Sequence, residues 1–290
     1  MSTLKLGIPK GSLQESTINL FKKAGYLITI DRRSYYPRVD DDEIRAMLLR
    51  PQEMALYVEK GVIDIGLAGQ DWIQECRADV VEVAEFNYSR STNKPSRWVL
   101  AVAEESNIQS VKELDGQIIF TELVESTKKY LAENGVNARV KFSHGATEVK
   151  IPHLCQAIVE LTETGNSLKA NQLRIIDTVM ESVTTMVANR SSWKNEWKKT
   201  KIENLKMLLS GALKAQGKVG LKMNIPSDQL DELIAILPAM RNPTISSLSQ
   251  DEWYAVETVI DQHTCRDLIP KLRRIGAEGI IEYTLNKVIP

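Results

Sequence analysis

Short apolar runs and helical patterns alternate along the first third of the chain. Each apolar run has the length of a strand and is bounded by glycine, proline or polar residues. Between them, apolar residues recur at the spacing of a helix face, and glycines stand where helices should end. This alternation predicts a mostly parallel sheet, in which ligands bind beyond the carboxyl ends of the strands. The predicted strands are 4–9, 27–30, 46–49 and 62–69, and the predicted helices are 13–24, 52–60 and one that opens at 70.

A polar stretch without periodicity, residues 90–96, separates this pattern from a second one. The stretch contains Pro95 and is the predicted linker between two α/β units. The second pattern again alternates strands with a helix and runs to residue 188. Its predicted strands are 98–103, 118–121, 138–142, 156–161, 174–182 and 184–188, and its predicted helix is 126–134.

A charged helical segment, residues 191–213, precedes a C-terminal part with a different order of predicted elements. The predicted order there is strand, helix, strand, strand, helix, strand, which is the split ferredoxin-like arrangement. Pro270 lies inside the second of these helices and should kink it or remove one hydrogen bond. The predicted strands are 219–225, 244–248, 253–261 and 279–288, and the predicted helices are 228–237 and 264–275.

The composition narrows the class of protein. The 290 residues include 37 Lys and Arg against 38 Asp and Glu, a net charge of −1, which argues against a nucleic-acid partner. No apolar run approaches the roughly 20 residues of a membrane helix, and the N-terminus shows no signal-peptide pattern. The scattered residues Cys76, Cys155 and Cys265 favour reduced thiols in the cytoplasm. With three histidines and no zinc motif, a histidine-rich metal centre is excluded.

Residues 157–168 carry the most specific chemistry. An apolar strand ends near Glu160 and Glu163, a run of hydroxyl residues surrounds Gly165, and a helix follows. Gly165 allows a tight turn in which backbone N–H groups converge on a phosphate, and the helix N-terminus adds partial positive charge. Two carboxylates before such a loop resemble the phosphoribosyl-diphosphate (PRPP) signature of phosphoribosyltransferases. On the loop alone, an ordinary strand-to-helix connection with a capping serine remains the alternative. The hydroxyl residues are Thr162, Thr164 and Ser167.

Further motifs occur along nearly the whole chain. They are LGIPKGSL (6–13), Arg50 in LLRPQE, DIGLAGQDW (64–72), RWVLAVA (97–103), GATEVKIP (145–152), residues 157–173, residues 244–260 and GAEGIIE (276–282). Together they resemble the long form of the ATP phosphoribosyltransferase family, the first enzyme of histidine biosynthesis. The chain departs from the family in three places. Ser12 lies at or beside a common arginine, Glu160 replaces the usual aspartate, and Ser167 replaces a common threonine.

The resemblance implies a fold of three parts. Two α/β lobes of the periplasmic-binding-protein type would hold the active site between them, and a C-terminal ferredoxin-like domain of the ACT type would regulate them. Residues 1–93 with about 183–211 would form the first lobe, and 94–182 would form the second lobe with the PRPP loop. Residues 212–290 would form the regulatory domain.

The resemblance also implies a reaction and a site. PRPP would lie on the loop 160–168, and N1 of ATP would attack the ribose C1 with loss of pyrophosphate. Mg²⁺ is the implied cofactor, carried mainly by the pyrophosphate, and no metal ligand is assigned in the chain. Structural alternatives stay open at Lys10 (a solvated loop lysine), Arg50 (an ion pair) and Asp71 (a charge at a helix N-terminus). The implied catalytic residues are Glu160 and Glu163; the PRPP-binding residues are Thr162, Thr164, Gly165, Asn166, Ser167 and Leu168; the ATP-binding residues are Lys10, Gly11, Ser12, Arg50, Gly69 and Asp71.

Regulation and assembly are expected from the resemblance alone. Histidine would inhibit through the C-terminal domain, with Asp261, His263 and Thr264 as candidate effector residues. The chain would assemble as a hexamer built from dimers and would have small-molecule partners, without nucleic acid or membrane. A cytoplasmic two-lobed sensor without transferase activity is the alternative function. Such a sensor would not need the two glutamates of the PRPP-like loop.

Overall fold

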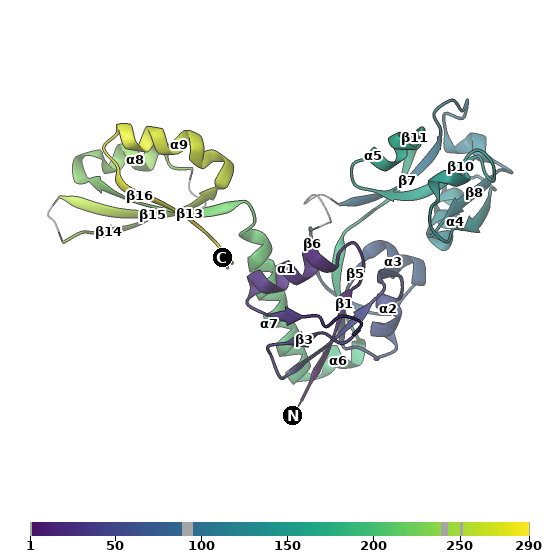
Figure 1. Ribbon diagram of the computed structural model, residues 1–290, viewed down its shortest axis with the longest axis horizontal. Helices are drawn as coiled ribbons and strands as arrows, with labels where there is room; N and C mark the ends of the chain where they lie inside the picture. Colours follow the sequence, from purple (N-terminus) through teal and green to yellow (C-terminus); the bar gives the residue numbers. More distant parts are fainter. Residues whose placement is uncertain (1, 89–94, 239–242, 250–251, 290) are drawn as a thin grey trace. The chain divides into compact units, whose positions relative to one another are not determined.

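The chain folds into two compact units, Met1–Lys206 and Met207–Pro290. The computed structural model describes residues 2–88, 95–238, 243–249 and 252–289 (Figure 1). Of the predicted linker at 90–96, only Pro95 and Ser96 lie within the described residues. Each helix in the described ranges is too short or too polar to cross a bilayer.

The first lobe of the larger unit is a five-stranded sheet. β1 pairs in parallel with β4 and with β5, so that Leu6 lies opposite Ala46 on one side and Ile65 on the other. β12 lies between β5 and β6 and is antiparallel to both. The order across the sheet is β4 (Ile44–Leu49), β1 (Leu4–Pro9), β5 (Ile65–Gly69), β12 (Thr184–Ala188) and β6 (Val81–Phe86), with a separate ladder of β2 (Ile28–Thr29) and β3 (Arg38–Val39).

Three helices follow the parallel strands of this lobe, namely α1 (Gln14–Ala24), α2 (Pro51–Glu59) and α3 (Gln70–Cys76). α1 ends at Gly25, whose φ of 100° is a left-handed conformation that glycine adopts readily. α2 starts at Pro51, which suits the first helical position because no N–H partner is needed there. Since β1 and β5 are parallel, the loops after them open at one edge of the sheet, where the predicted ligand site should lie.

The predicted single helix at 191–213 is wrong, because the segment forms two helices, α6 (Arg190–Lys194) and α7 (Glu196–Lys214). The Asn189 side chain accepts hydrogen bonds from the N–H groups of Ser191 and Ser192 and caps α6. Asn195 has extended backbone angles, and its side chain accepts from the N–H of Lys198 at 3.0 Å. Two asparagine caps six residues apart therefore divide the segment.

Buried and half-buried ion pairs anchor α7 to the first lobe. The Asp64 carboxylate is buried and accepts from the Lys198 Nζ and the Ser192 Oγ, both at 2.6 Å. One turn further on, the Lys201 Nζ lies 2.8 Å from Asp41 and 2.7 Å from Glu43. Because Asp64, Asp41 and Lys201 are largely shielded from water, the pairs of Asp64 with Lys198 and of Asp41 with Lys201 hold the helix more firmly than exposed pairs would.

The second lobe is another five-stranded sheet. Its central strands β7 and β10 are antiparallel and bury Leu100, Val102 and Val159 completely. The lobe also contains two helices, α4 (Val124–Glu133) and α5 (Asn166–Ala170). It has two 3₁₀ turns, Val111–Leu114 and Glu148–Lys150. The order across the sheet is β11 (Leu173–Ser182), β7 (Ser96–Ala103), β10 (Ala157–Thr162), β8 (Ile118–Thr121) and β9 (Arg139–Phe142).

The two predicted α/β lobes are confirmed, but their sheets are not mostly parallel. Each sheet has two parallel and two antiparallel ladders. The chain passes between the lobes twice, after β6 and after β11. The first strand after each crossing, β7 or β12, runs antiparallel to both of its neighbours in the sheet. β6 has no counterpart among the predicted strands, because its sequence VEVAEF carries two glutamates and buries only Phe86 fully.

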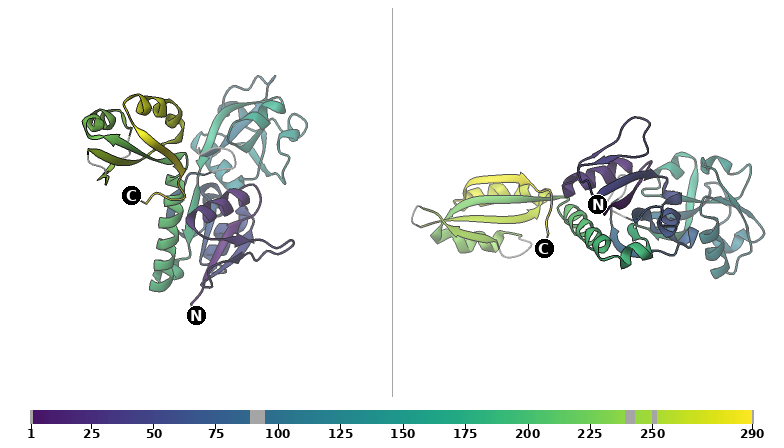
Figure 2. Two further views of the ribbon diagram at one scale, coloured as in Figure 1. Left: turned by 60° about the vertical axis from the view of Figure 1, so that its left-hand side comes forward. Right: turned by 90° about the horizontal axis from the view of Figure 1, so that it is seen from below.

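The smaller unit confirms the predicted ferredoxin-like order. All three ladders of its sheet are antiparallel, and α8 and α9 cover one face (Figures 1 and 2). The core between them includes Leu221, Leu233 and Leu272. α9 continues through Pro270. The elements are β13 (Lys218–Pro226), a 3₁₀ turn (Ser227–Gln229), α8 (Leu230–Ile236), β14 (Thr244–Ser247), β15 (Trp253–Asp261), α9 (Gln262–Arg274) and β16 (Glu278–Thr284), in the sheet order β14-β15-β13-β16.

Candidate active site

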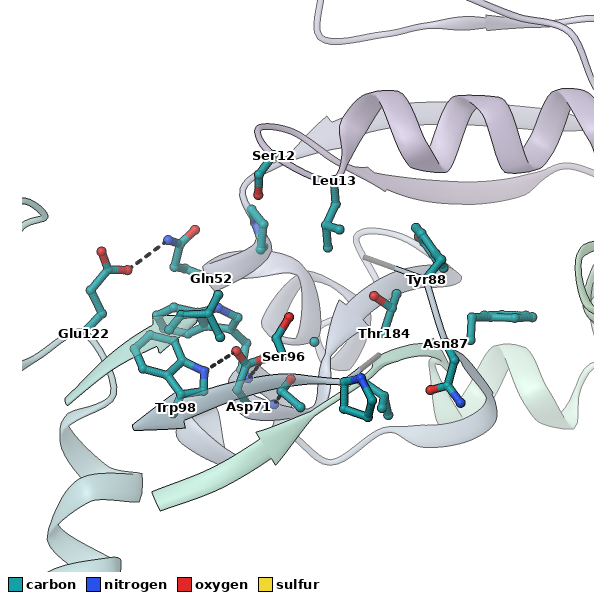
Figure 3. A pocket seen from close by; sticks show the side chains of 18 of the residues that line it. Ser12, Leu13, Gln52, Asp71, Asn87, Tyr88, Ser96, Trp98, Glu122 and Thr184 are labelled. Carbon is teal, nitrogen blue, oxygen red and sulfur yellow. Dashed lines mark hydrogen bonds between the residues drawn. The ribbon is translucent and has the colours of Figure 1, made fainter. Parts of the chain in front are cut away.

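A cavity of about 220 Å³ is lined by residues of both lobes of the larger unit (Figure 3). The loops after β1 and β5 contribute on one side, and β7, β10 and the segment after β8 contribute on the other. Residues next to the two crossings between the lobes close the remainder. The lining residues include Ser12, Leu13, Gln52, Gly69, Asp71, Trp72, Tyr88, Trp98, Glu122, Glu160, Ser182 and Thr184.

Asp71 lines this cavity from the first lobe and is hydrogen-bonded to residues of the second lobe. The Trp98 Nε1 donates to its carboxylate at 2.7 Å, as Figure 3 shows, and the N–H of Asp71 donates to the Ser182 Oγ at 3.2 Å. Gly69 is needed beside it, because a Cβ there would collide with the Asp71 carboxylate. Burial raises the pKa of Asp71, against the lowering effect of its hydrogen bonds from Trp98 and Ser182. The carboxylate therefore does more than complement a helix dipole.

The raised pKa of Asp71 predicts a pH-dependent stability. A raised pKa means that the folded protein binds the proton more tightly than the unfolded chain, so this stabilisation is present at acidic pH. It is lost as the pH rises through the folded pKa, and each tenfold difference in proton affinity between the two states corresponds to about 1.4 kcal/mol. Asp71→Asn keeps an acceptor for Trp98 and cannot titrate. We expect its free energy of unfolding, relative to wild type, to rise between pH 4.5 and 8 in urea titrations. A difference that is independent of pH would contradict the assignment.

The loop after β10 is shaped by its own hydroxyl groups. Gly165 has a φ of 78°, and its N–H donates to the Thr162 Oγ1 at 2.7 Å. The N–H of Asn166 donates to the Thr164 Oγ1 at 3.4 Å. We expected successive amides to converge on a phosphate, and this is wrong for Gly165 and Asn166. Their N–H groups donate to threonine side chains of the loop instead. Ser167 is the second residue of α5, where an amide has no carbonyl acceptor within the helix.

The predicted loop residues differ in what they present to a ligand. Glu160 lines the cavity, whereas Glu163 is half-buried and is not among the lining residues. The Leu168 side chain is buried with Ile158 in the core of the second lobe, so only its backbone is available for binding. The Ser167 Oγ donates to the Glu148 Oε1 at 2.7 Å, which ties the loop to the preceding GATEVK segment.

Glu160 is half-buried and its side chain lines the cavity. Burial raises its pKa, and the negative charges of Glu148 and Glu122 raise it further. Hydrogen bonds from the Thr147 side chain and from the N–H of Leu161, the latter at 3.2 Å, act in the opposite direction. A carboxylate held in this way is suited to accept hydrogen bonds from neutral donors such as sugar hydroxyls.

The predicted ATP-binding residues fall into two groups. Ser12, Gly69 and Asp71 line the cavity together with Glu160, whereas Lys10, Gly11 and Arg50 do not. The Lys10 Nζ lies 4.1 Å from the centre of the Tyr35 ring. Arg50 precedes α2 in extended conformation, next to residues that do line the cavity.

Sequence reasoning missed the residues beside the two crossings between the lobes. Tyr88, Trp98, Ser182 and Thr184 line the cavity but were not among the expected site residues. The Trp98 ring also packs edge-on against Trp72, with ring centres 6.4 Å apart. The available signal was the predicted domain boundary, because segments that connect two lobes also border the space between them.

The candidate effector residues lie together in the smaller unit, where β15 meets α9. The Lys218 Nζ donates to Asp261 at 2.7 Å and holds the pKa of that exposed carboxyl below its ordinary value. The Thr264 Oγ1 donates to the carbonyl of Asp261 at 2.7 Å, and His263 is exposed. Nothing in this geometry identifies a ligand.

Comparison with known proteins gives the family. A family model described as ATP phosphoribosyltransferase matches residues 50–211, and one described as HisG, C-terminal domain, matches residues 215–287. The chain is 59% identical over 286 residues to the ATP phosphoribosyltransferase of Pelodictyon phaeoclathratiforme, covering 99% of this chain and 97% of that protein. It is 60% identical over 286 residues to the ATP phosphoribosyltransferase of Chlorobium chlorochromatii, with coverage of 99% and 97%.

A solved structure agrees with these relatives. The ATP phosphoribosyl transferase (HisG:HisZ) complex from Thermotoga maritima has a chain that is 29% identical, with a TM-score of 0.61 over 72% of this chain and 99% of that chain. The fold and the matches together define a pentosyltransferase. The chain belongs to the ATP phosphoribosyltransferase family, the first enzyme of histidine biosynthesis.

Proposed function

We propose that this chain transfers the phosphoribosyl group of PRPP to N1 of ATP, forming phosphoribosyl-ATP and pyrophosphate. The observation that supports this most is the Glu160 carboxylate, which lines the cavity at the end of β10 beside the Gly165 loop. In a chain of this family, that carboxylate is suited to the ribose hydroxyls of PRPP. The same cavity offers Ser12, Gly69 and Asp71 on the opposite lobe for the purine nucleotide.

The loop after β10 would hold the 5′-phosphate of PRPP. The amide of Ser167 in the first turn of α5 and the hydroxyl of Thr164 supply donors for phosphate oxygens. Lys10 and Arg50, on loops that adjoin the cavity lining, would neutralise the phosphates of ATP. We assign Glu163 and Thr162 to shaping this loop and Glu160 to direct contact with the substrate.

The chemistry is a displacement at the ribose C1. The lone pair of adenine N1 forms the new N–C bond, the bond from C1 to the pyrophosphate oxygen breaks, and pyrophosphate leaves with its electron pair. N1 carries no proton before the attack, so no base is needed for that step. The C1 centre gains oxocarbenium character, and the chain acts by orientation and charge stabilisation. Within the described residues, no three His, Cys, Asp or Glu side chains gather to hold a metal. We propose that Mg²⁺ enters on the phosphates of the substrate.

Pyrophosphate release tests this function directly. Mixing the protein with ATP, PRPP and Mg²⁺ should release one pyrophosphate per phosphoribosyl-ATP formed, with no release when either substrate is omitted. The competing function is a two-lobed sensor that binds small molecules without turnover. Tight histidine binding in the absence of any pyrophosphate release would favour that sensor. The free residues Cys76, Cys155 and Cys265 are consistent with a cytoplasmic enzyme, which we also propose.

We further propose that the smaller unit confers inhibition by histidine and that the chain assembles into a hexamer. The larger unit has its own sheets and cores, so a chain that ends at Lys218 should keep turnover. Deleting residues 219–290 is expected to abolish inhibition at histidine concentrations that inhibit the full chain at least tenfold. Initial rates with and without histidine measure this. A truncated enzyme that retains its circular dichroism and is still inhibited would refute the proposed role.

A further inference from the structure

Helix α3 follows β5 of the first lobe, yet several of its side chains bind the second lobe. Asp71 in its first turn accepts from the Trp98 Nε1 at 2.7 Å. The next residue, Trp72, packs against the core cluster of the second lobe that includes Trp98 and Leu100. The two lobes are therefore joined through side chains of α3, in addition to the two crossings of the backbone.

Glu75, one turn further along α3, binds the start of α4 in the second lobe. The N–H of Glu125 donates to its Oε1 and the N–H of Ser126 donates to its Oε2, both at 2.9 Å. These are the second and third residues of α4, whose amides have no acceptor within the helix. Leu123 precedes α4 with an apolar side chain and cannot cap it. The cap of α4 is thus supplied by the other lobe.

Charge and partial burial strengthen the contact of Glu75 with α4. A carboxylate that accepts two amide protons makes charge-assisted hydrogen bonds, and its charge lies where the helix dipole is positive. Glu75 is half-buried, and both bonds are partly shielded from water. The ion pair of Arg77 with Glu125 crosses the same boundary, but its side chains are 78% and 43% exposed, so it contributes little.

The contact between α3 and α4 is close to the cavity along both chain segments. Asp71, four residues before Glu75 on the same face of α3, lines the cavity from the first lobe. Glu122, three residues before Glu125, lines it from the second lobe. A rotation of the lobes that separates α3 from α4 would therefore also change the spacing between the two walls of the cavity.

We propose that Glu75 is a positioning residue that holds the two lobes in the arrangement that closes the cavity, and that it acts through the N-terminus of α4. Its effect on the reaction rests on the proposed function, in which PRPP binds one lobe and ATP the other. Without this contact, the closed arrangement is less populated before the substrates bind. The apparent affinity for substrate falls by the same factor, whereas saturating substrates restore closure.

Glu75→Gln in the full chain tests the proposal, because it keeps the size of the side chain and removes its charge and one acceptor. We expect KM for PRPP to rise about tenfold, the effect of losing a hydrogen bond to a charged group, with kcat within about twofold of wild type. Pyrophosphate release measures both. A cap that only stabilised α4 would instead lower the fraction of folded enzyme, and with it kcat, and would leave KM unchanged.

Acrylamide quenching of tryptophan fluorescence reports on the lobes without turnover. Trp98 is 2% exposed, and it contacts the first lobe through its bond to Asp71 and through the Trp72 ring, with ring centres 6.4 Å apart. Separation of the lobes uncovers this side chain. The quenching constant of Glu75→Gln without substrates should therefore be higher than that of wild type, at a temperature where thermal unfolding shows both to be folded.

Glu113 provides a matched control within one lobe. Its Oε1 accepts from the N–H groups of Gln109 at 3.2 Å and Ser110 at 3.0 Å, so it also binds two adjacent amides, but both belong to the second lobe. Glu113→Gln should leave KM and the quenching constant unchanged. Arg77→Gln, which removes the exposed pair across the boundary, should change KM less than about twofold.

The outcomes distinguish this proposal from the proposed function. A lower kcat in Glu75→Gln with unchanged KM and unchanged quenching would overturn the positioning role, because the cap would then serve stability alone. An equal rise in KM in Glu113→Gln would overturn it as well. If the wild-type protein releases no pyrophosphate, the proposed function has failed, and the quenching comparison still decides whether Glu75 holds the lobes together.

Discussion

Glu160→Gln is expected to lower kcat/KM by about 10²- to 10³-fold, the loss seen when one preorganised charge-stabilising group is removed from an active site. The amide keeps the volume of the side chain and one acceptor oxygen, but it loses the charge that we propose accepts from the ribose hydroxyls and stabilises a cationic C1. Glu160 is the member of the predicted catalytic pair that lines the cavity. Steady-state pyrophosphate release measures the effect.

A neighbouring glutamate in the same loop is the control. Glu163 is half-buried outside the cavity lining, so Glu163→Gln should lower kcat/KM by less than about tenfold. Glu160→Asp retains the charge with a shorter side chain and should keep more activity than Glu160→Gln. Equal losses in Glu160→Gln and Glu163→Gln would show that the loop, and not one carboxylate, carries the effect.

Gly165→Val is expected to reduce turnover at least about 100-fold, because the loop proposed to bind phosphate cannot keep its shape. Gly165 has a φ of 78°, and a Cβ there would lie 3.8 Å from Ile175, so space is available but the conformation is not. Holding a valine in left-handed geometry costs about 1–2 kcal/mol. We expect the variant to relieve this strain by rotating the peptide, which breaks the hydrogen bond from the N–H of residue 165 to Thr162.

Gly135 provides a matched control for this backbone effect. It has a φ of 70°, nothing lies within 4 Å of an added Cβ, and it follows α4 away from the cavity. Gly135→Val should lower the free energy of unfolding by an amount similar to Gly165→Val and leave turnover intact. Urea titrations and initial rates of both variants decide this. Comparable turnover losses in the two variants would mean that destabilisation alone explains the result for Gly165.

The local parts of the fold could be predicted from the sequence because they depend on neighbouring residues. The apolar run of β10 followed by Gly165 identified both the strand and the loop, and the alternation in β13 identified the first strand of the smaller unit. The insertion of β12 between β5 and β6 could not be predicted, because partners such as Thr184 and Gly69 are more than a hundred residues apart. Such pairing is decided by the packing of the whole sheet.

In the candidate site, too, some features could be predicted from neighbouring residues and others could not. Glycines and carboxylates that follow strands, such as Gly69 and Glu160, could be predicted from their places in the pattern. The bond between Trp98 and Asp71 could not, since a tryptophan inside an apolar run is expected to be core.

The helix α7 belongs to both units, and this affects how the chain can be cut. The boundary at Lys206 lies inside the helix, whose start is held by Lys198 and Lys201 and whose Gly211 carbonyl accepts from Val288 at 2.9 Å. Proteases need a locally unfolded stretch, which most domain boundaries provide as a loop. Limited trypsin digestion should therefore spare Lys206, although its side chain is a trypsin target. The two units should survive as one fragment until the shared helix unwinds.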